Sequence, residues 1–177
     1  MLSEPGVRYW TGDFNEIVLS PEVARSIQRV IWVAPVSQET RDHSIEIKGL
    51  ESFLRNLEPE ILARFVYCST LAVNFPHRFP GMEKAVAAHG IAEELIAGSK
   101  LPFTIVRPGE LTFGQGDQPL VIGESITTGG YVNRRDLAGL LVRLSQWSWT
   151  KDQRLEVVQR PDGRRIGEWA IPRRLGT

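Results

Sequence analysis

The sequence predicts an α/β layer fold, with a mainly parallel sheet and helices on its faces. Apolar, strand-like runs alternate strictly with helical stretches along the chain, and several of these runs end at proline or glycine. The chain has 177 residues, of which 42% are hydrophobic and 24% charged. These values are typical of one globular domain. We place that domain at residues 1–159, followed by a basic tail at residues 160–177.

The N-terminal part of the chain predicts a short strand followed by a helix. The strand-like run covers residues 7–11. Ser20, Pro21 and Glu22 then supply an N-cap, a proline at the first helical position and an early acid. We therefore expect a helix over residues 21–28.

A second strand and a second helix follow. Residues 30–34 are continuous, β-branched and aromatic, which is typical of a strand covered on both faces, and Pro35 ends the run. Apolar residues at three- and four-residue spacing then predict a helix over residues 45–57. Pro59 ends that pattern because proline cannot continue a helix.

The middle of the chain repeats this alternation. Residues 64–70 predict a buried strand, and a polar loop at residues 74–81 leads to a long helix over residues 82–97. Residues 103–107 predict the next strand, which stops at Pro108.

The last predicted elements are a helix and a strand. After a loop rich in glycine, Asn133 can cap a helix that carries Asp136 in its first turn. Residues 155–159 then form a final strand-like run. The buried face of the helix is expected to consist of Leu137, Leu140, Leu141 and Leu144.

The single cysteine limits the chemistry of the chain. Cys68 alone excludes an internal disulfide and any zinc site built from cysteines. Because it lies in an apolar run, we interpret it as a small core residue rather than a nucleophile. No metal site is predicted.

Charge and hydropathy exclude two classes of partner. Lys and Arg (21) balance Asp and Glu (21), so no overall field favours nucleic acid, although residues 151–177 hold seven cations against four anions. The N-terminus has no basic and apolar signal, and no stretch is long and apolar enough to span a membrane. We expect a soluble protein.

Motifs along most of the chain match one family in order and spacing. The most specific is Phe-Thr-Ile-Val-Arg-Pro-Gly at residues 103–109, followed one strand later by Arg-Asp-Leu-Ala at residues 135–138. Over about residues 7–159 the sequence resembles the atypical, extended short-chain dehydrogenase/reductases, an NAD(P)H-binding group. The other matching motifs are Gly12-Asp13, Val-Ile-Trp-Val-Ala at 30–34, Lys-Gly at 48–49, Phe-Val-Tyr-Cys-Ser-Thr at 65–70 and Ala-Glu-Glu-Leu at 92–95.

The resemblance implies a Rossmann-like, doubly wound sheet and one side of a dinucleotide site. Ligands of such sheets bind at the carboxyl ends of the strands, where the relevant residues fall. An alternative remains open, in which Asp13 caps the following loop and Gly109 only turns the chain. By the resemblance, Asp13 and Phe14 meet the adenine, Ala34 and Pro35 lie along the cofactor, Ser69 and Thr70 stand at the active-site hydroxyl, and Pro108, Gly109 and Glu110 face the nicotinamide.

Two differences from the family bear on activity. The family's glycine motif, which holds the pyrophosphate at a helix N-terminus, does not occur in this sequence. The family also needs a tyrosine as general acid and a lysine four residues later. Aligned on Ala92 and Glu93, those positions hold Ala85 and His89. We expect no proton donor at Ala85, a partly exposed His89 without a task, and NAD(P) binding that is weak or nil.

The resemblance begins just before the family's third strand. Without a first and second strand, residues 30–34 would present an unpaired apolar edge, which favours pairing with another chain. Alternatively, residues 7–11 pair directly with residues 30–34, or the sequence is part of a longer protein. Trp147 and Trp149 either extend a partner surface or are buried against the domain.

These observations favour a non-catalytic, dehydrogenase-like accessory, assembly or scaffold subunit. By family resemblance, such a subunit would belong to a larger complex, respiratory or photosynthetic, in the cytoplasm, stroma or matrix. Its partner would be another protein or a second copy of the chain, with peripheral contact to a membrane complex. The alternatives are an NAD(P)H-dependent oxidoreductase or epimerase whose phosphate-binding segment lies outside this chain, and a dinucleotide-binding redox sensor.

Overall fold

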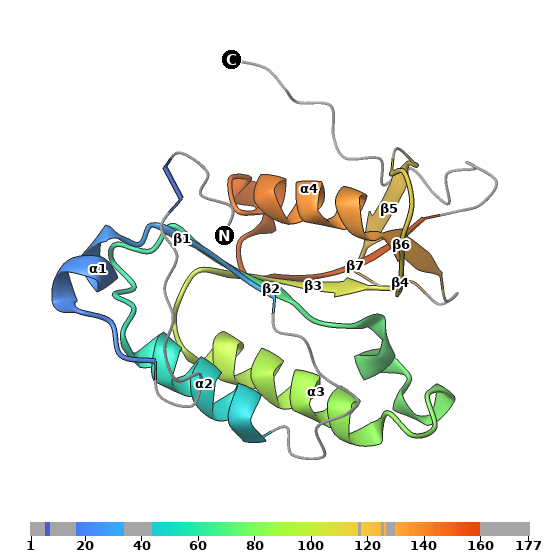
Figure 1. The fold of residues 1–177 in the computed structure, drawn as a ribbon, viewed down its shortest axis with the longest axis horizontal. Helices are drawn as coiled ribbons and strands as arrows, with labels where there is room; N and C mark the ends of the chain where they lie inside the picture. Colours follow the sequence, from blue (N-terminus) through green and yellow to red (C-terminus); the bar gives the residue numbers. More distant parts are fainter. Residues whose placement is uncertain are drawn as a thin grey trace.

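The computed structural model describes residues 6–7, 17–33, 44–116, 118–124, 126 and 130–159. One seven-stranded sheet separates two layers of helix (Figure 1). Helices α2 (Ser44–Arg55) and α3 (Glu83–Gly98) cover one face of the sheet, and α4 (Arg134–Leu144) covers the other. The α/β fold predicted from the sequence is confirmed.

The strand order is β1-β2-β3-β7-β6-β4, with β5 also paired to β7. Strands β1, β2, β3 and β7 run parallel to one another, and β4 runs parallel to β6. Only β5 and β6 are antiparallel to β7, so the sheet is mainly parallel, as predicted. The strands are β1 (Arg29–Trp32), β2 (Arg64–Cys68), β3 (Phe103–Pro108), β4 (Glu110–Thr112), β5 (Leu120–Gly123), β6 (Tyr131–Asn133) and β7 (Gln153–Gln159).

Both predicted helix caps are present. The Ser20 side chain accepts a hydrogen bond from the backbone N–H of Val23 at the start of α1 (Pro21–Ser26), which ends two residues before the expected boundary. The Asn133 side chain accepts from the N–H of Arg135 at 2.9 Å. Each cap satisfies a backbone donor that has no partner inside its helix.

The segment expected to be a glycine-rich loop contains strands β4, β5 and β6, so that prediction was wrong. Each of these strands has only three or four residues, and such short runs give no periodic signal. The polar loop expected at residues 74–81 includes parts of two short 3₁₀ helices, η1 (Leu71–Asn74) and η2 (Pro76–Arg78). A third, η3 (Ser148–Thr150), precedes β7.

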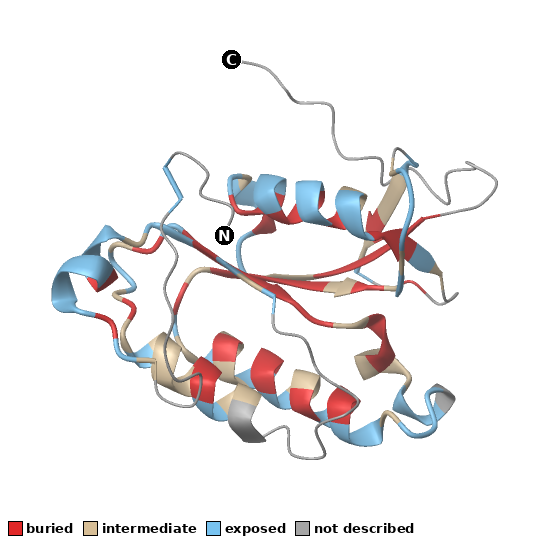
Figure 2. Cartoon of the chain, viewed as in Figure 1, coloured by how far each residue is buried: buried red, intermediate tan, exposed pale blue. Residues whose placement is uncertain are grey.

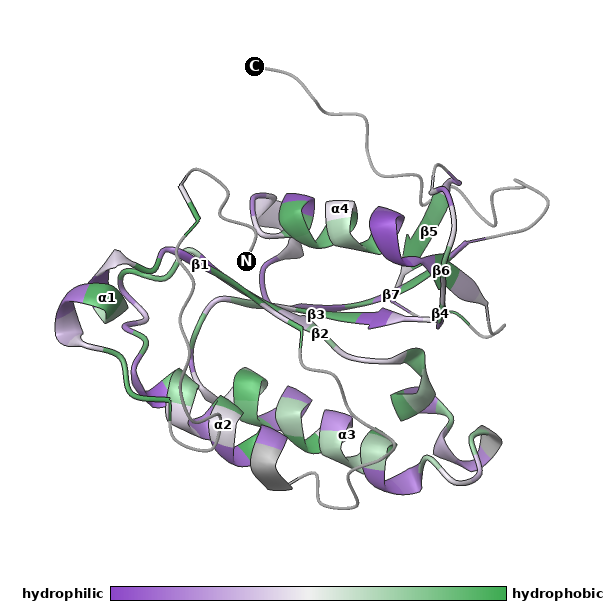
Figure 3. Ribbon diagram, in the orientation of Figure 1, coloured by the Kyte–Doolittle hydropathy of each residue, from purple (hydrophilic) through white to green (hydrophobic). Residues whose placement is uncertain are grey.

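The sheet separates the two larger hydrophobic clusters of the core, and a third, smaller one consists of Leu71, Ile126 and Val158. Figure 2 shows the buried residues along the strands and on the sides of α3 and α4 that face the sheet. Figure 3 shows the same central strands as largely hydrophobic. The cluster beneath α2 and α3 includes Leu50, Phe65, Tyr67, Ile96 and Ile105, and the cluster beneath α4 includes Val66, Cys68, Val106, Leu141 and Leu144.

Strand β1 lies at the edge of the sheet. Among the described residues, it pairs with β2 on one side and with no strand on the other. The expectation that this strand is covered on both faces was wrong. Val30 is buried and Trp32 packs on Phe53, but Ile31 and Val33 are 40% and 60% exposed. Helix α4 lies over the middle of the sheet (Figure 1), and Nε of Arg29 on β1 donates to the Ser145 carbonyl just after α4 at 3.1 Å.

Several predictions fall outside the described residues. One is the strand at residues 7–11, most of which is not described, together with its pairing to residues 30–34. Another is the basic tail at residues 160–177. Trp147 packs against the cluster beneath α4. The Trp149 ring stacks on the Trp147 ring and is 48% exposed. No helix in the described part of the chain is long and apolar enough to cross a membrane.

Candidate functional site

The carboxyl ends of β2 and β3 meet at one edge of the sheet. Cys68, the last residue of β2, lies opposite Val106, and the N–H of Ser69 donates to the Val106 carbonyl at 2.7 Å. Pro108 ends β3 two residues after Val106, and Gly109 follows it. The structure therefore brings Ser69, Pro108 and Gly109 to the edge where ligands of parallel sheets bind.

The remaining predicted site residues are placed less completely. Asp13, Phe14, Ala34 and Pro35 lie outside the described residues. Glu110 is exposed at the start of β4. The Thr70 hydroxyl accepts from the N–H of Ala72 and caps η1, which gives it a local structural task.

The Ser69 hydroxyl points away from solvent, toward helix α3. It donates to Oε1 of Glu93 at 2.5 Å, and the two side chains are buried. Arg107 on β3 grips the same carboxylate, with Nε 3.0 Å from Oε1 and Nη2 2.6 Å from Oε2. The hydrogen bonds to Glu93 raise the pKa of Arg107 above its ordinary value. Ser69 is thus fixed as a donor to Glu93, and only its lone pairs remain for other groups.

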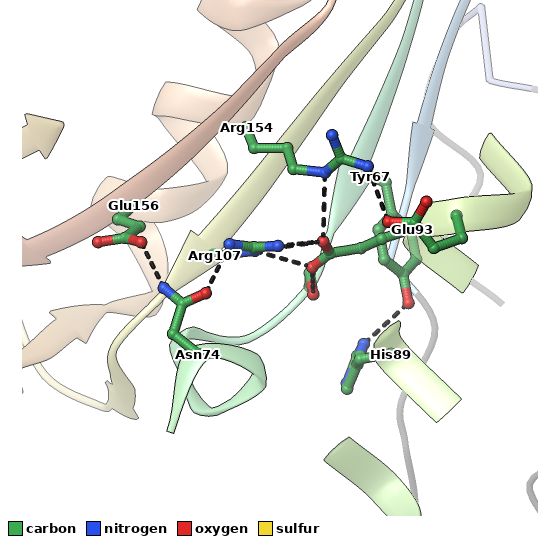
Figure 4. Close-up of polar contacts among 9 residues, drawn as sticks. Tyr67, Asn74, His89, Glu93, Arg107, Arg154 and Glu156 are labelled. Carbon is green, nitrogen blue, oxygen red and sulfur yellow. Dashed lines mark hydrogen bonds and ion pairs between the residues drawn. The ribbon is translucent and has the colours of Figure 1, made fainter. Parts of the chain in front are cut away.

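The polar network continues across the sheet (Figure 4). Nη1 of Arg107 donates to Oδ1 of Asn74 at 2.6 Å, and Nδ2 of Asn74 donates to Oε1 of Glu156. Glu156 on β7 also accepts from the backbone N–H of Ile126. The network therefore ties η1, α3, β3, β7 and the segment after β5 together beneath the candidate site.

Tyr67 and His89 form a second polar pair on the α3 side of the sheet. The Tyr67 hydroxyl lies 2.8 Å from Nδ1 of His89 (Figure 4). Burial, with smaller contributions from the charges of Glu93, Cys68 and Glu46, raises the pKa of Tyr67 well above its ordinary value. The phenol thus keeps its proton at neutral pH. His89 is partly exposed, as expected, and the structure gives it this hydrogen bond, which the sequence did not predict.

Ala85, at the position of the family's tyrosine, is buried on α3. Its methyl group cannot donate a proton. His89 lies one turn along the helix from Ala85, where the Tyr67 hydroxyl reaches it from β2, and Tyr67 is only 4% exposed. Sequence reasoning did not pair Tyr67 with His89 because they are 22 residues apart on different elements.

Gly109 allows the backbone between β3 and β4 to approach the backbone before β6 closely. Its N–H donates to the Val157 carbonyl, and the next N–H, of Glu110, donates to the Gly130 carbonyl, both at 2.9 Å. A Cβ atom at Gly109 would lie 2.2 Å from that Gly130 oxygen. Only glycine fits, so the edge of the site has a tightly packed backbone wall.

Metal-ligating side chains do not form a cluster in the described part of the chain. Among the described residues, no group of three or more histidine, cysteine, aspartate or glutamate side chains could hold a metal ion. The acids near the site, Glu93 and Glu156, are already committed to arginine, serine, asparagine and backbone donors.

The chain is similar to known nucleotide-binding proteins. A family model described as NAD(P)H-binding matches residues 2–146. A solved structure of a putative NAD-dependent epimerase/dehydratase from Bacillus halodurans is 21% identical, with a TM-score of 0.73 over 84% of this chain and 71% of that one. No curated protein matches.

Two further solved structures share the fold. The anaerobilin reductase ChuY from Escherichia coli O157:H7 is 18% identical, with a TM-score of 0.70 over 88% of this chain and 77% of that one. The oxidoreductase YlbE from Lactococcus lactis is 16% identical, with a TM-score of 0.71 over 90% and 74%. At these identities the likeness shows the fold, which is Rossmann-like.

Proposed function

Because the chain belongs to the NAD(P)H-binding family, we propose that it forms the nicotinamide side of an NAD(P)H-dependent oxidoreductase or epimerase, whose pyrophosphate-binding segment lies outside this chain. The observation that carries the proposal is the meeting of Ser69, Pro108 and Gly109 at the carboxyl ends of two adjacent parallel strands. This is the edge at which open α/β sheets bind their ligands.

The described residues fit one end of a dinucleotide and not the other. Ser69, Pro108 and Gly109 carry no charge themselves, which suits the neutral ring of the reduced nicotinamide, and the exposed Glu110 follows them. A diphosphate needs backbone N–H groups at a helix N-terminus that follows a glycine-rich turn. None of the helices in the described ranges begins directly after such a turn at the end of a strand.

Among the described residues, no strand pairs with the outer edge of β1, which provides a place for the proposed pyrophosphate-binding segment. Parallel strands point alternate backbone groups to opposite sides. The Gln28 carbonyl accepts from the Ala63 N–H, so it faces β2. The backbones of Arg29, Ile31 and Val33 therefore face outward, where a partner strand can pair with them. The exposed Ile31 and Val33 side chains would be covered by the same partner.

The residues of this chain would position the cofactor. They would not supply the tyrosine that acts as the family's general acid. When bound, the nicotinamide supplies or accepts the hydride. The buried Ser69 hydroxyl, already donating to Glu93, would hold the end of β2 in place against α3 and so position the backbone at this edge for the cofactor. The wall at Gly109 limits how far a ligand can move toward β6.

A second candidate function is the non-catalytic accessory or scaffold subunit. It is favoured by one specific observation, which is that the family's acid position is a buried alanine, Ala85, while Ser69 is held by Glu93. General acid–base assistance typically contributes about 10²- to 10⁴-fold to a rate. The accessory function therefore predicts no hydride transfer and no specific dinucleotide binding.

Calorimetric titration of the purified chain with NADPH, NADH and ADP-ribose separates the two candidates. The proposed function predicts saturable NADPH or NADH binding with Kd on the order of 0.1–1 mM, and weaker binding of ADP-ribose, which lacks the nicotinamide. Ser69→Ala is expected to weaken binding at least about threefold. The matched control is Ser145→Ala, a buried serine that ends α4 and donates to the Val142 carbonyl.

The outcomes are distinct. A folded chain with no saturable binding, or one that binds ADP-ribose as tightly as NADPH, would overturn the nicotinamide-side proposal. Equal losses in Ser69→Ala and Ser145→Ala would show a general loss of stability rather than a binding contact.

A further inference from the structure

The outward side of helix α4 is basic. The helix forms the outer layer on its side of the sheet (Figure 1), and its outward side is exposed (Figure 2). Arg134, Arg135 and Arg143 are exposed on this helix. Its one acid, Asp136, is only partly exposed and accepts a hydrogen bond from Nε2 of Gln159. The fully exposed charges of α4 are therefore all positive.

An exposed aromatic ring lies at each end of this helix. At its start, the guanidinium carbon of Arg134 lies 4.2 Å from the centre of the Phe113 ring, and Phe113 is 82% exposed. Beyond its end, the Trp149 ring stacks on Trp147 with the ring centres 5.8 Å apart, and Trp149 is 48% exposed. With a rise of about 1.5 Å per residue, α4 is roughly 16 Å long. The arginines thus lie between two exposed rings.

From this arrangement we propose that the outward side of α4 binds the surface of an anionic lipid bilayer. Anionic headgroups attract arginine side chains, and aromatic rings favour the boundary between headgroups and acyl chains. Phe113 and Trp149 would enter this boundary while Arg135 and Arg143 stay among the headgroups. This contact goes beyond the proposed function and does not depend on it.

Charge complementarity is what favours an anionic occupant over a second copy of the chain. Antiparallel packing of two α4 helices about an axis close to Gly139 would place Arg135 of one copy against Arg143 of the other, and like charges repel. The exposed residues between these arginines include Ala138, Gly139 and Val142. These three side chains cannot donate hydrogen bonds to base edges, as reading a nucleic acid sequence requires. A bilayer needs only charge and apolar contact, which this side supplies.

Vesicle flotation of the whole chain tests the contact. At about 0.1 M salt, the chain should bind phosphatidylcholine vesicles with about 30% phosphatidylserine at least about tenfold more tightly than pure phosphatidylcholine vesicles, because each arginine near an anionic surface strengthens binding roughly fivefold. Raising the salt to about 0.5 M should weaken this binding at least about tenfold, because salt screens exposed charges. No binding, or equal binding to both vesicles, would overturn the proposal.

Two variants separate the contribution of the charges from that of the rings. Arg135→Glu with Arg143→Glu should weaken binding to the anionic vesicles at least about tenfold. Phe113→Ser should weaken it at least about threefold, because the ring no longer leaves water. Both variants keep residues 160–177, whose five arginines against two acids form the basic tail, so a loss of binding reports on α4.

The matched controls lie on the other helical layer. Lys48→Glu with Lys84→Glu makes the same change of charge at exposed positions of α2 and α3. Ile91→Ser changes an apolar residue of α3 that is 50% exposed. Both controls should bind anionic vesicles within about twofold of the original chain. Circular dichroism should show that all four variants are folded.

The remaining outcomes decide between a bilayer and other anionic partners. Equal losses in the α4 variants and their controls would show an effect of net charge alone. Unchanged binding of Phe113→Ser, with the arginine variant impaired, would show a surface for polyanions in general. Tighter binding to a DNA duplex of about 20 base pairs than to the vesicles would assign the surface to nucleic acid. Each of these three results would overturn the proposal.

Discussion

Glu93 shows how a single buried charge organises the candidate site. Its side chain is 1% exposed and accepts hydrogen bonds from Ser69 and Arg107, while Nε of Arg154 lies 3.7 Å away. Such a carboxylate is tolerated in the interior only because its partners replace water. The same contacts hold Ser69, which follows the last residue of β2 at the candidate site, against α3.

The first prediction concerns the removal of one partner of this carboxylate. Arg107→Ala should lower the free energy of unfolding by about 3 kcal/mol, because Glu93 then stays buried without its bidentate partner. Arg55→Ala is the control, since it breaks an exposed pair with Glu51 on α2 and should cost about 0.5 kcal/mol or less. Urea unfolding of both variants checks the difference. Similar losses would show that the Glu93 pair contributes no more than a surface pair.

A second residue-scale prediction concerns alkaline pH. Burial raises the pKa of Cys68 to about 11 from 9.0. The unfolded chain therefore loses the thiol proton near pH 9, whereas the folded chain keeps it until about pH 11. The contribution of the protonated thiol is complete below pH 9 and is lost as pH rises to 11.

Between pH 8 and pH 10, the original chain should lose roughly 1 kcal/mol more stability than Cys68→Ala. Urea midpoints at the two pH values measure this. The raised pKa of Tyr67 adds a loss at higher pH that is common to both proteins. Parallel declines in the two proteins would contradict a buried thiol with a raised pKa.

At the scale of elements, a helix or strand could be predicted when the residues that stabilise it are close together in the sequence. Caps such as Ser20 and Asn133 act within three residues, so the sequence alone located α1 and α4. Strand β4 has three residues and exists because it pairs with β6, about 20 residues later. No local pattern carries that information.

For the candidate site, the positions of residues along the strands were predictable from the sequence, but their hydrogen-bond partners were not. The motifs placed Ser69 and Pro108 at strand ends, and the structure brings both to one edge. The hydrogen bonds that decide what these residues can do were not predictable. Glu93 reaches Ser69 across 24 residues, and Tyr67 reaches His89 across 22, so only the packing of α3 on the sheet reveals these pairs.

The third prediction contrasts two glycines on different elements. Gly109→Ala should destabilise the chain by several kcal/mol, about 3 or more, because its Cβ would lie 2.2 Å from the Gly130 oxygen and force apart the backbone segments that lead into β4 and β6. Gly139→Ala lies within α4, with nothing within 4 Å of a new Cβ. It should stabilise by about 0.5–1 kcal/mol. Thermal unfolding compares the two, and a neutral Gly109→Ala would mean that the turn after β3 is not tightly packed.

At the scale of the whole molecule, the sheet joins the two helical layers into one cooperative unit. Side chains on a strand alternate between its faces. Phe65 and Tyr67 of β2 therefore enter the cluster beneath α2 and α3, whereas Val66 and Cys68 enter the cluster beneath α4. Loss of either helical layer exposes one face of the same strands.

The last prediction tests this coupling with one buried leucine from each layer. Leu50 on α2 and Leu144 on α4 are at most 1% exposed. Each change to alanine should lower the free energy of unfolding by about 2–5 kcal/mol, because it removes apolar contacts and leaves a cavity. Since β2 and β3 belong to both clusters, each variant should still unfold in one transition. Far-ultraviolet circular dichroism and tryptophan fluorescence should give the same midpoint. Separate midpoints in the Leu144→Ala variant, with the α2 and α3 layer surviving the loss of α4, would show that the sheet does not couple the two layers.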